Sequence, residues 1–168
     1  MQKILLYHYV PKDAFFAEKG ILSVSLQTEA LSKYAKRAKT QNPKEIIDWL
    51  EGTFNGRSKA IPVLTEPVKW QGNDPMPKEW IKRKILLTID YNKLLTDDLI
   101  EAVYCKEMSE ENGFNEKIYR ILPNQIDFSP LSWNKCSYEK GLFFGAIRHY
   151  FLVMKNGYIP YEYIQAQN

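Results

Sequence analysis

A histidine near the start of the chain stands between two tyrosines, in the segment Leu5-Leu6-Tyr7-His8-Tyr9-Val10. The apolar residues of this segment predict a β-strand over residues 3–10, with His8 in its C-terminal half. Many nucleotide-binding sheets present side chains to a ligand at this end of a strand. His8 is therefore a candidate ligand-binding residue. The alternative is a histidine with a structural role, in the core or on the surface.

Several common catalytic motifs are missing from the sequence. It has no Walker loop, GxGxxG fingerprint, HExxH motif or GxSxG nucleophile elbow, so the enzyme classes that depend on them have no support. The two cysteines, Cys105 and Cys136, lack CxxC spacing and cannot form a zinc site with only two histidines. We therefore expect no metal, and free thiols in a reducing compartment. Cys136 paired with His149 as a nucleophile is the alternative to a half-buried thiol.

Length and composition indicate one globular domain that covers residues 1–168. The chain is 45% hydrophobic and 26% charged, as in ordinary soluble proteins, and it is long enough to bury a core. Its net charge of +3 comes from scattered lysines and arginines, whereas a nucleic-acid-binding domain usually has a denser basic face. No run of about 18 apolar residues predicts a membrane span. The start of the chain is typical of a cytoplasmic protein, and equally of an effector secreted into a host cell without a classical signal peptide.

The amino-terminal third is expected to hold one strand and three helices. Pro11 opens the first helix, which Gly20 ends as a C-cap. Apolar residues at helical spacing predict a second helix over residues 27–38. A third helix begins at Asn42-Pro43 and is stopped by Gly52.

The rest of the sequence favours β-strands. Residues 60–65 predict a short strand in which Pro62 indicates a sheet edge or a bulge. After an irregular loop, residues 84–89 predict the clearest strand of the chain, and residues 90–95 a turn that leaves it. A further strand follows over residues 101–105.

The end of the chain carries the strongest turn signal. Asn156-Gly157 lies between two β-rich segments and predicts a β-hairpin. Together with the preceding elements it indicates an α+β domain with two small, mainly antiparallel sheets, in which the helices of residues 11–51 are inserted after the first strand.

Four segments of the chain resemble the ADP-ribosyltransferase-like superfamily, which includes the DarT-type DNA-modifying toxins, tRNA 2′-phosphotransferases and many uncharacterised bacterial domains. The opening Leu-Tyr-His-Tyr strand, with the helix and the Gly-Ile-Leu-Ser segment that follow it, is similar to the start of these proteins. The other similar segments are Leu-Thr-Glu-Pro at 64–67, Leu-Leu-Thr-Ile-Asp-Tyr at 86–91 and Ile-Pro-Tyr-Glu-Tyr-Ile at 159–164. They cover most of the chain in the family's order.

The resemblance implies that NAD binds as a substrate, in a cleft between two short sheets. His8 matches the first-strand histidine that hydrogen-bonds the adenosine-side ribose. Thr65 lies near the second-strand position that steadies the pocket. Tyr7 and Tyr9 point to the other face of the strand, so the aromatic ring that stacks on the nucleotide is expected elsewhere, with Tyr34 as the candidate.

The resemblance also implies a late glutamate that stabilises the oxocarbenium ion as nicotinamide leaves, because positive charge develops on the ribose in the transition state. In DarT-like proteins this glutamate precedes a Phe-Leu-Val run, where the present chain has Tyr150, here assigned to the nucleotide site. In another branch a Tyr-Glu-Lys-Glu segment takes this place, and Tyr138-Glu139-Lys140 matches its first half. Glu139 is therefore the candidate catalytic residue, ahead of Glu66 and Glu162.

Three functions follow from these observations. The first is a bacterial or phage-type toxin or effector that transfers ADP-ribose from NAD to a protein or nucleic-acid acceptor. The second is a catalytically inactive member of the same fold that acts as a binding or effector module, which the tyrosine at position 150 favours. The third is an unrelated α+β protein-interaction domain with a patch of tyrosine and tryptophan.

Overall fold

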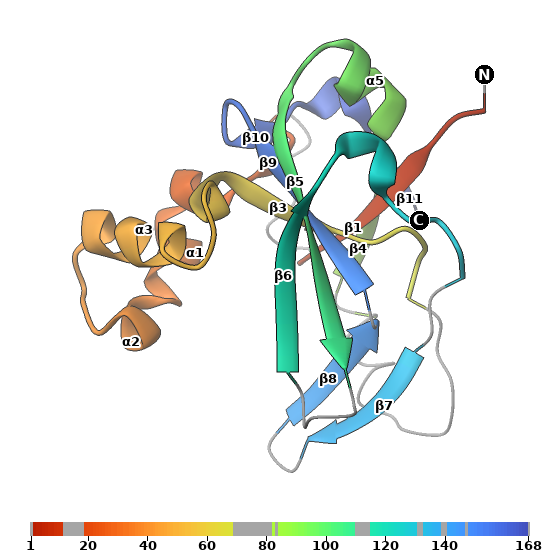
Figure 1. Cartoon of the computed structure of the whole chain (residues 1–168). Helices are drawn as coiled ribbons and strands as arrows, with labels where there is room; N and C mark the ends of the chain where they lie inside the picture. The colour runs from red at the N-terminus through yellow and green to blue at the C-terminus, as the bar shows by residue number, and fades with distance from the viewer. Residues whose placement is uncertain are drawn as a thin grey trace.

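The computed structural model describes residues 2–11, 19–68, 82, 84–109, 115–130, 133–138, 141–146 and 148–167. Figure 1 shows the chain as a mixture of strands and short helices. The helices are α1 (Thr28–Ser32), α2 (Ala35–Ala38), α3 (Pro43–Glu51) and α5 (Tyr91–Thr96). The strands are β1 (Leu5–Pro11), β2 (Ile21–Leu22), β3 (Ala60–Val63), β4 (Lys84–Asp90), β5 (Ile100–Ser109), β6 (Asn115–Ile121), β7 (Trp133–Tyr138), β8 (Gly141–Ala146), β9 (Arg148–Met154), β10 (Tyr158–Ile159) and β11 (Ile164–Gln167).

Two larger sheets form the body of the protein. One has the strand order β1-β4-β11 and the other β3-β9-β5-β6. Two-stranded sheets of β2 with β10 and of β7 with β8 complete the described strands, and every pairing among them is antiparallel. An α+β architecture with small antiparallel sheets is therefore confirmed.

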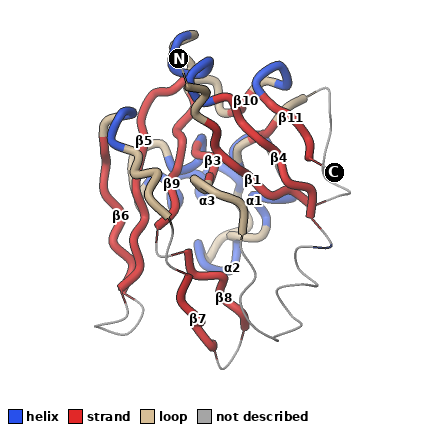
Figure 2. The backbone as a smooth tube through the Cα atoms, turned by 90° about the vertical axis from the view of Figure 1, so that its right-hand side faces the viewer, coloured by secondary structure: helices blue, strands red, loops and turns tan. Residues whose placement is uncertain are grey.

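The two larger sheets meet along the line between β1 and β3. Tyr7 and Leu64 form an isolated antiparallel bridge, in which each residue donates its backbone N–H to the other's carbonyl at 2.8 Å. Figure 2 shows β6, β5, β9 and β3 following one another across the molecule toward β1 and β4. Pro62 lies in β3, the edge strand of its sheet, so the expectation of an edge is confirmed.

The main hydrophobic core takes residues from both larger sheets. Leu6 and Ile89 come from one sheet, and Val63 and Leu152 from the other, all at most 2% exposed. A second, smaller cluster covers the opposite face of β9, with Phe151 as a member. Both faces of β9 are therefore buried, as the apolar run Tyr-Phe-Leu-Val-Met requires.

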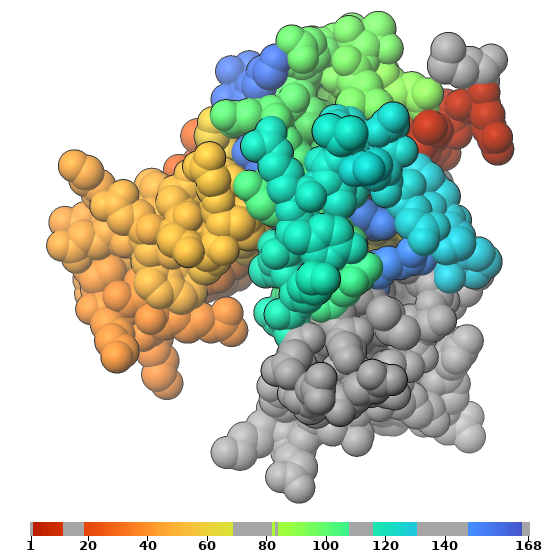
Figure 3. Space-filling model, viewed as in Figure 1, coloured from red at the N-terminus to blue at the C-terminus, as the bar shows by residue number. Residues whose placement is uncertain are grey.

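The helices α1, α2 and α3 form a unit of their own that projects from the body (Figures 1 and 3). Leu31, Ala35, Ile46 and Leu50 make its core. The third expected helix is confirmed: the Asn42 side chain accepts a hydrogen bond from the Lys44 N–H, and Gly52 is the C-cap.

The expected single helix over residues 27–38 is wrong, because the structure breaks it into α1 and α2. At the break, Lys33 and Tyr34 donate their N–H groups to carbonyls three residues earlier, at 3.3 and 3.0 Å. Such bonds tighten the backbone into a 3₁₀-like turn. The turn positions the Tyr34 ring against Trp49 of α3, with 6.2 Å between ring centroids.

The turn expected over residues 90–95 is in fact the helix α5. Asp90 ends β4 and caps this helix, since its Oδ1 accepts a hydrogen bond from the Lys93 N–H at 3.1 Å. An aspartate at this position satisfies an N–H that a helix start otherwise leaves without a partner. Tyr91 and Leu94 then bury one side of the helix in the main core.

The Asn156-Gly157 hairpin is also wrong. The chain does turn there, with Gly157 at φ 76° and its N–H bonded to the Met154 carbonyl. The strand that follows, β10, pairs with β2 through Tyr158↔Leu22 and Ile159↔Ile21. The reason is that β3 and β5 already occupy both edges of β9, so β9 has no edge to offer. Pro11, which was expected to open a helix, is instead the last residue of β1 and pairs with Lys84. Residues 12–18 of that expected helix lie outside the described residues, as do residues 69–80 of the loop.

The pairing of β10 with β2 gives a stability test at Gly20. This residue has φ +75°, and a Cβ added to it would lie 2.0 Å from the Ile159 carbonyl oxygen. We expect Gly20→Ala to lower the free energy of unfolding by about 2 kcal/mol or more, because backbone strain and a backbone clash add together. Urea denaturation measures the change.

The matched control is Gly52→Ala. Gly52 has φ −68° and its added Cβ would be 3.2 Å from the nearest atom, so we expect a change below about 1 kcal/mol. Equal effects of the two substitutions would contradict the close approach of β10 to Gly20.

Candidate functional site

The two larger sheets separate where β1 leaves β3. The next reciprocal pair after Tyr7 and Leu64 would join residues 9 and 62. Pro62 has no N–H, so it cannot complete that pair, and the ladder stops after one bridge. Residues on either side of this bridge therefore lie at the point where the sheets diverge, which we call the junction.

His8 follows the bridge on β1 and contacts the strand opposite. Its Nδ1 lies 2.6 Å from the Pro62 carbonyl oxygen. A carbonyl only accepts, so Nδ1 carries the proton and Nε2 is left as an acceptor. Desolvation lowers the pKa of this half-buried histidine to about 4, which the bond to Pro62 opposes and nearby Lys84 reinforces. His8 is thus a neutral side chain with its ring fixed at one nitrogen.

Thr65 lies on the other side of the bridge, just beyond β3. Thr65 as a whole is half-buried. Its hydroxyl oxygen Oγ1 is fully buried and has no hydrogen-bond partner among the described residues. A buried hydroxyl without a partner is costly. The junction therefore holds an acceptor, His8 Nε2, and a hydroxyl that has no partner among the described residues.

Tyr150 reaches the junction from β9, where it pairs with Val63 of β3. Only 2% of the residue is exposed, and it belongs to the main core. The Asp127 N–H donates a hydrogen bond to its hydroxyl oxygen at 3.0 Å. Burial raises the pKa of Tyr150, more than the bond to Asp127 lowers it. The side chain is therefore a neutral phenol that anchors the segment around Asp127.

Tyr34 lies in the helical unit, away from these residues. Its hydroxyl accepts a hydrogen bond from Arg57 Nη2 at 3.3 Å. The Arg57 guanidinium in turn stacks over Phe151, at 4.9 Å from the ring centroid. Phe151 and Tyr150 are neighbours in β9 and point to opposite faces. His8, Thr65 and Tyr150 thus lie on the side of the junction. Tyr34 lies on the side of Phe151, which is the opposite face of β9. Glu139 lies outside the described residues.

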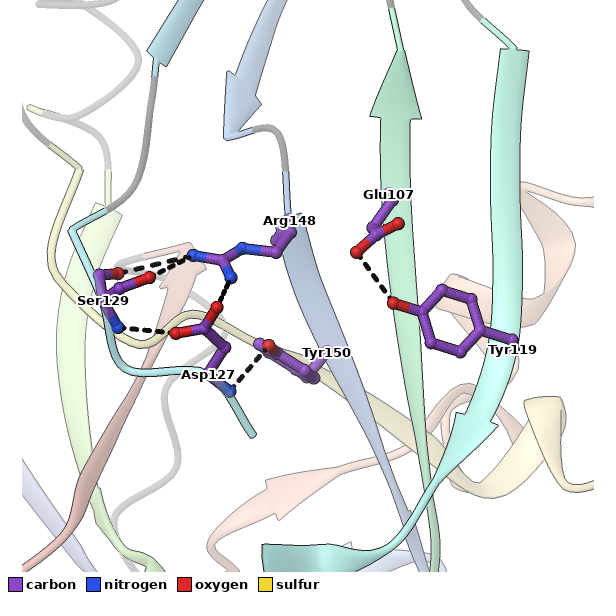
Figure 4. Close-up of polar contacts among 6 residues, drawn as sticks. All are labelled: Glu107, Tyr119, Asp127, Ser129, Arg148 and Tyr150. Carbon is purple, nitrogen blue, oxygen red and sulfur yellow. Dashed lines mark hydrogen bonds and ion pairs between the residues drawn. The ribbon is translucent and has the colours of Figure 1, made fainter. Parts of the chain in front are cut away.

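A polar cluster beside Tyr150 is missing from the sequence prediction. Figure 4 shows its members on β5, β6 and β9 and on the segment that follows β6. Glu107 of β5 is directly across from Arg148 of β9, yet the guanidinium points away from it, toward Asp127 and Ser129. The Glu107 carboxylate instead accepts a hydrogen bond from the Tyr119 hydroxyl at 2.7 Å.

Arg148 is held by the segment that follows β6. Its Nη1 forms an ion pair with Asp127, and its Nη2 donates to Ser129 Oγ at 3.1 Å. Hydrogen bonds from Ser129 and the contact with Arg148 lower the pKa of Asp127 to about 2. Asp127 is therefore an anion at physiological pH, and it is paired with the Arg148 cation beside the junction.

Cys105 of β5 lies directly across from Tyr119 of β6 and from Tyr150 of β9, and its thiol interacts with both side chains. Burial raises its pKa, and the negative charge of Glu107 acts in the same direction. The interaction with Cys105 in turn raises the pKa of Tyr119. Cys105 is a neutral, buried thiol and is not activated as a nucleophile.

One sequence signal could have revealed the cluster. Along β5, Val103 and Cys105 face the main core, so the alternation of a strand puts Glu107 on the same face. On β9 the same alternation aligns Arg148 with Tyr150 and Leu152. Charged residues at inward positions of a strand are rare and need partners. Their partners Tyr119 and Asp127, however, lie far away in sequence.

The chain matches no protein-family model, curated protein or solved structure. Within the described residues, no group of three or more His, Cys, Asp and Glu side chains is arranged to hold a metal ion. No helix in that part of the chain is long and apolar enough to cross a membrane.

The histidines predict how stability depends on pH. Desolvation lowers the pKa of both His8 and His149 to about 4, from 6.5. Between these values the unfolded chain binds protons that the folded chain does not. The stability that the two neutral histidines contribute is complete above about pH 6.5 and is lost as the pH falls toward 4. Each histidine lowers the free energy of unfolding by up to about 1.4 kcal/mol per pH unit in this range.

His8→Asn tests this contribution, because the amide nitrogen can still donate to the Pro62 carbonyl but the side chain does not titrate. We expect the loss of stability between pH 6.5 and 4.5 to be clearly smaller in this variant than in the wild type, as measured by urea denaturation at each pH. Identical slopes would mean that His8 titrates normally in the folded protein.

Proposed function

We propose that the chain binds NAD at the junction of its two larger sheets and acts as an ADP-ribosyltransferase-like protein. The observation that carries this proposal is the state of His8. Its Nδ1 is fixed on the Pro62 carbonyl, and its low pKa keeps Nε2 free of a proton. Ribose hydroxyls are hydrogen-bond donors, and a neutral Nε2 is the matching acceptor.

The geometry around His8 supports the same ligand. The resemblance of the sequence places a histidine on the first strand and the nucleotide between two short sheets. In this chain the two sheets diverge beside His8, directly after a single bridge. Thr65, on the opposite side of that bridge, has a buried hydroxyl without a partner among the described residues. A ligand could reach this buried oxygen only after a local rearrangement, and its ribose or amide group would then satisfy it.

Transfer of ADP-ribose would proceed by displacement at the nicotinamide ribose. The bond between C1′ and the nicotinamide nitrogen breaks, and its electron pair leaves with nicotinamide. A nucleophilic atom of a protein or nucleic-acid acceptor bonds to C1′ and loses its proton. A carboxylate near C1′ lowers the barrier, because positive charge is greatest on the ribose in the transition state. Glu139 is the candidate from the sequence, and Glu107 is a described carboxylate beside Tyr150.

A second function, NAD binding without turnover, is favoured by Tyr150. This residue precedes the Phe-Leu-Val run where the resemblance expects a glutamate. Its hydroxyl is occupied by the Asp127 N–H, and burial raises its pKa. A neutral phenol cannot supply the negative charge that the departure of nicotinamide requires. In this case the protein is a binding or effector module.

Calorimetric titration with NAD tests the binding site. We expect the wild type to bind NAD, and His8→Asn to bind it roughly 10-fold to 100-fold more weakly, because Asn replaces Nδ1 but offers no counterpart of Nε2. Unfolding temperatures should stay close to each other, since the bond to Pro62 is kept.

His8→Gln is the companion variant, because its amide reaches the Nε2 position and should restore part of the affinity. A wild type that gives no heat with NAD, or a His8→Asn variant that binds NAD normally, contradicts the proposed site.

Release of nicotinamide distinguishes the transferase from the binding module. For an active transferase, we expect Glu139→Gln to slow release at least about 100-fold while NAD binding is kept, because the amide has the shape of the carboxylate without its charge. Glu162→Gln is the control, since Glu162 is exposed.

Glu107→Gln belongs in the same series. If Glu107→Gln no longer releases nicotinamide while Glu139→Gln releases it normally, then Glu107 of β5 is the catalytic carboxylate. No release from the wild type, together with measurable NAD binding, would establish the binding module instead.

A further inference from the structure

Arg148 has a more restricted environment than a surface arginine. Its side chain is 18% exposed, and it extends from the first residue of β9 on the same face as Tyr150. Besides the ion pair with Asp127, Nη2 donates to the hydroxyl and the carbonyl oxygen of Ser129, at 3.1 and 3.4 Å. The guanidinium is thus held in a fixed orientation by contacts that do not involve the Asp127 carboxylate.

The Asp127 carboxylate, in contrast, is 51% exposed. The backbone around it is anchored separately. Its own N–H bonds to the Tyr150 hydroxyl, the Tyr91 hydroxyl donates to the Pro123 carbonyl at 2.7 Å, and Ile126 is buried in the main core. Rotation of the Asp127 side chain would therefore release Arg148 without movement of the segment, at the cost of the bond that its Oδ1 accepts from the Ser129 N–H at 2.9 Å.

We propose that Arg148 is a binding residue for the diphosphate group of a ligand at the junction, and that the Asp127 carboxylate occupies this anion site until the ligand displaces it. The identity of the ligand as NAD rests on the proposed function, whereas the anion site does not.

The position of Arg148 suits such a ligand. It is on β9, and His8 is on β1, with β3 between them. The last pair between β3 and β9 is Val63 with Tyr150, two residues before Arg148 on the same face of β9. A nucleotide that bonds to His8 through its ribose would direct its phosphates across β3 toward this end of β9.

The energetics favour exchange of the two anions. An ion pair with a half-exposed carboxylate contributes little to stability, because water screens it. A diphosphate brings more negative charge and several oxygens, and Nη1, the nitrogen that Asp127 now occupies, can donate to it while Nη2 stays on Ser129. Glu107, across from Arg148 on β5, is bonded to Tyr119 and does not compete for the guanidinium.

Asp127→Asn is the decisive variant. The amide oxygen can still accept from the Ser129 N–H, as Asp127 Oδ1 does at 2.9 Å, so the local turn is kept while the charge is removed. We expect the affinity for both pyrophosphate and NAD to rise about fivefold, the factor that corresponds to an exposed ion pair. Affinity for nicotinamide riboside, which has no diphosphate, should not change. Isothermal titration measures all three.

The control is Asp98→Asn. Asp98 pairs with Lys155 at 2.7 Å and is 84% exposed, so the substitution changes the net charge equally at a remote place. It should leave the affinity for pyrophosphate unchanged. An equal gain in Asp98→Asn would show a general charge effect and overturn the proposal.

A second background tests the role of Arg148 itself. In Arg148→Gln, and in Arg148→Met if the first variant unfolds, the gain from Asp127→Asn should disappear, because neither side chain carries a charge. A gain that persists without Arg148 overturns the proposal, as does an unchanged affinity of Asp127→Asn for pyrophosphate. Tighter pyrophosphate binding without any NAD binding would support the anion site and reject the proposed function alone.

Discussion

The missing N–H of Pro62 is the constraint on which the arrangement of the two larger sheets depends. An ordinary residue at this position could extend the ladder between β1 and β3 beyond the single bridge at Tyr7 and Leu64. The two sheets would then join as one. Because the ladder stops, the Pro62 carbonyl is available to the His8 side chain. The same residue therefore separates the sheets and fixes the imidazole at the point of separation.

Strand β9 divides the molecule into two regions with different roles. Tyr150 and Arg148 share the face toward the junction, whereas Phe151 faces the smaller cluster and the Arg57 guanidinium that leads to Tyr34. The helical unit is thus tied to one face of β9 and the polar cluster to the other. A nucleotide at the junction would contact the second region. Tyr34 can join the same site only if the ligand passes around the edge of the sheet.

Capping residues and proline predicted local structure correctly, whereas the helical spacing over residues 27–38 did not reveal the break between α1 and α2. Asn42 and Gly52 marked the ends of α3, and Pro62 marked an edge strand, because each acts through its own backbone. The Asn156-Gly157 turn was also recognised, but not its strand partner, which depends on the free edges of distant strands.

The same distinction holds for the site. His8 could be selected from the sequence because a polar residue in an apolar strand is conspicuous. Its neutral state could not, since it comes from burial and from Pro62, 54 residues away. Asp127 and Arg148 are 21 residues apart, and only the packing of the segment after β6 over β9 brings their charges together.

The two ends of the junction differ in charge, and this difference restricts the ligands that fit. At His8 the side chain is neutral, so it favours hydroxyl donors and gives an anion no advantage. At Arg148 a fixed cation is paired with a carboxylate that can rotate away. A ligand that satisfies both ends would need a hydrogen-bond donor for His8 and an anionic group for Arg148. A nucleoside diphosphate would supply both, through its ribose hydroxyls and its phosphates.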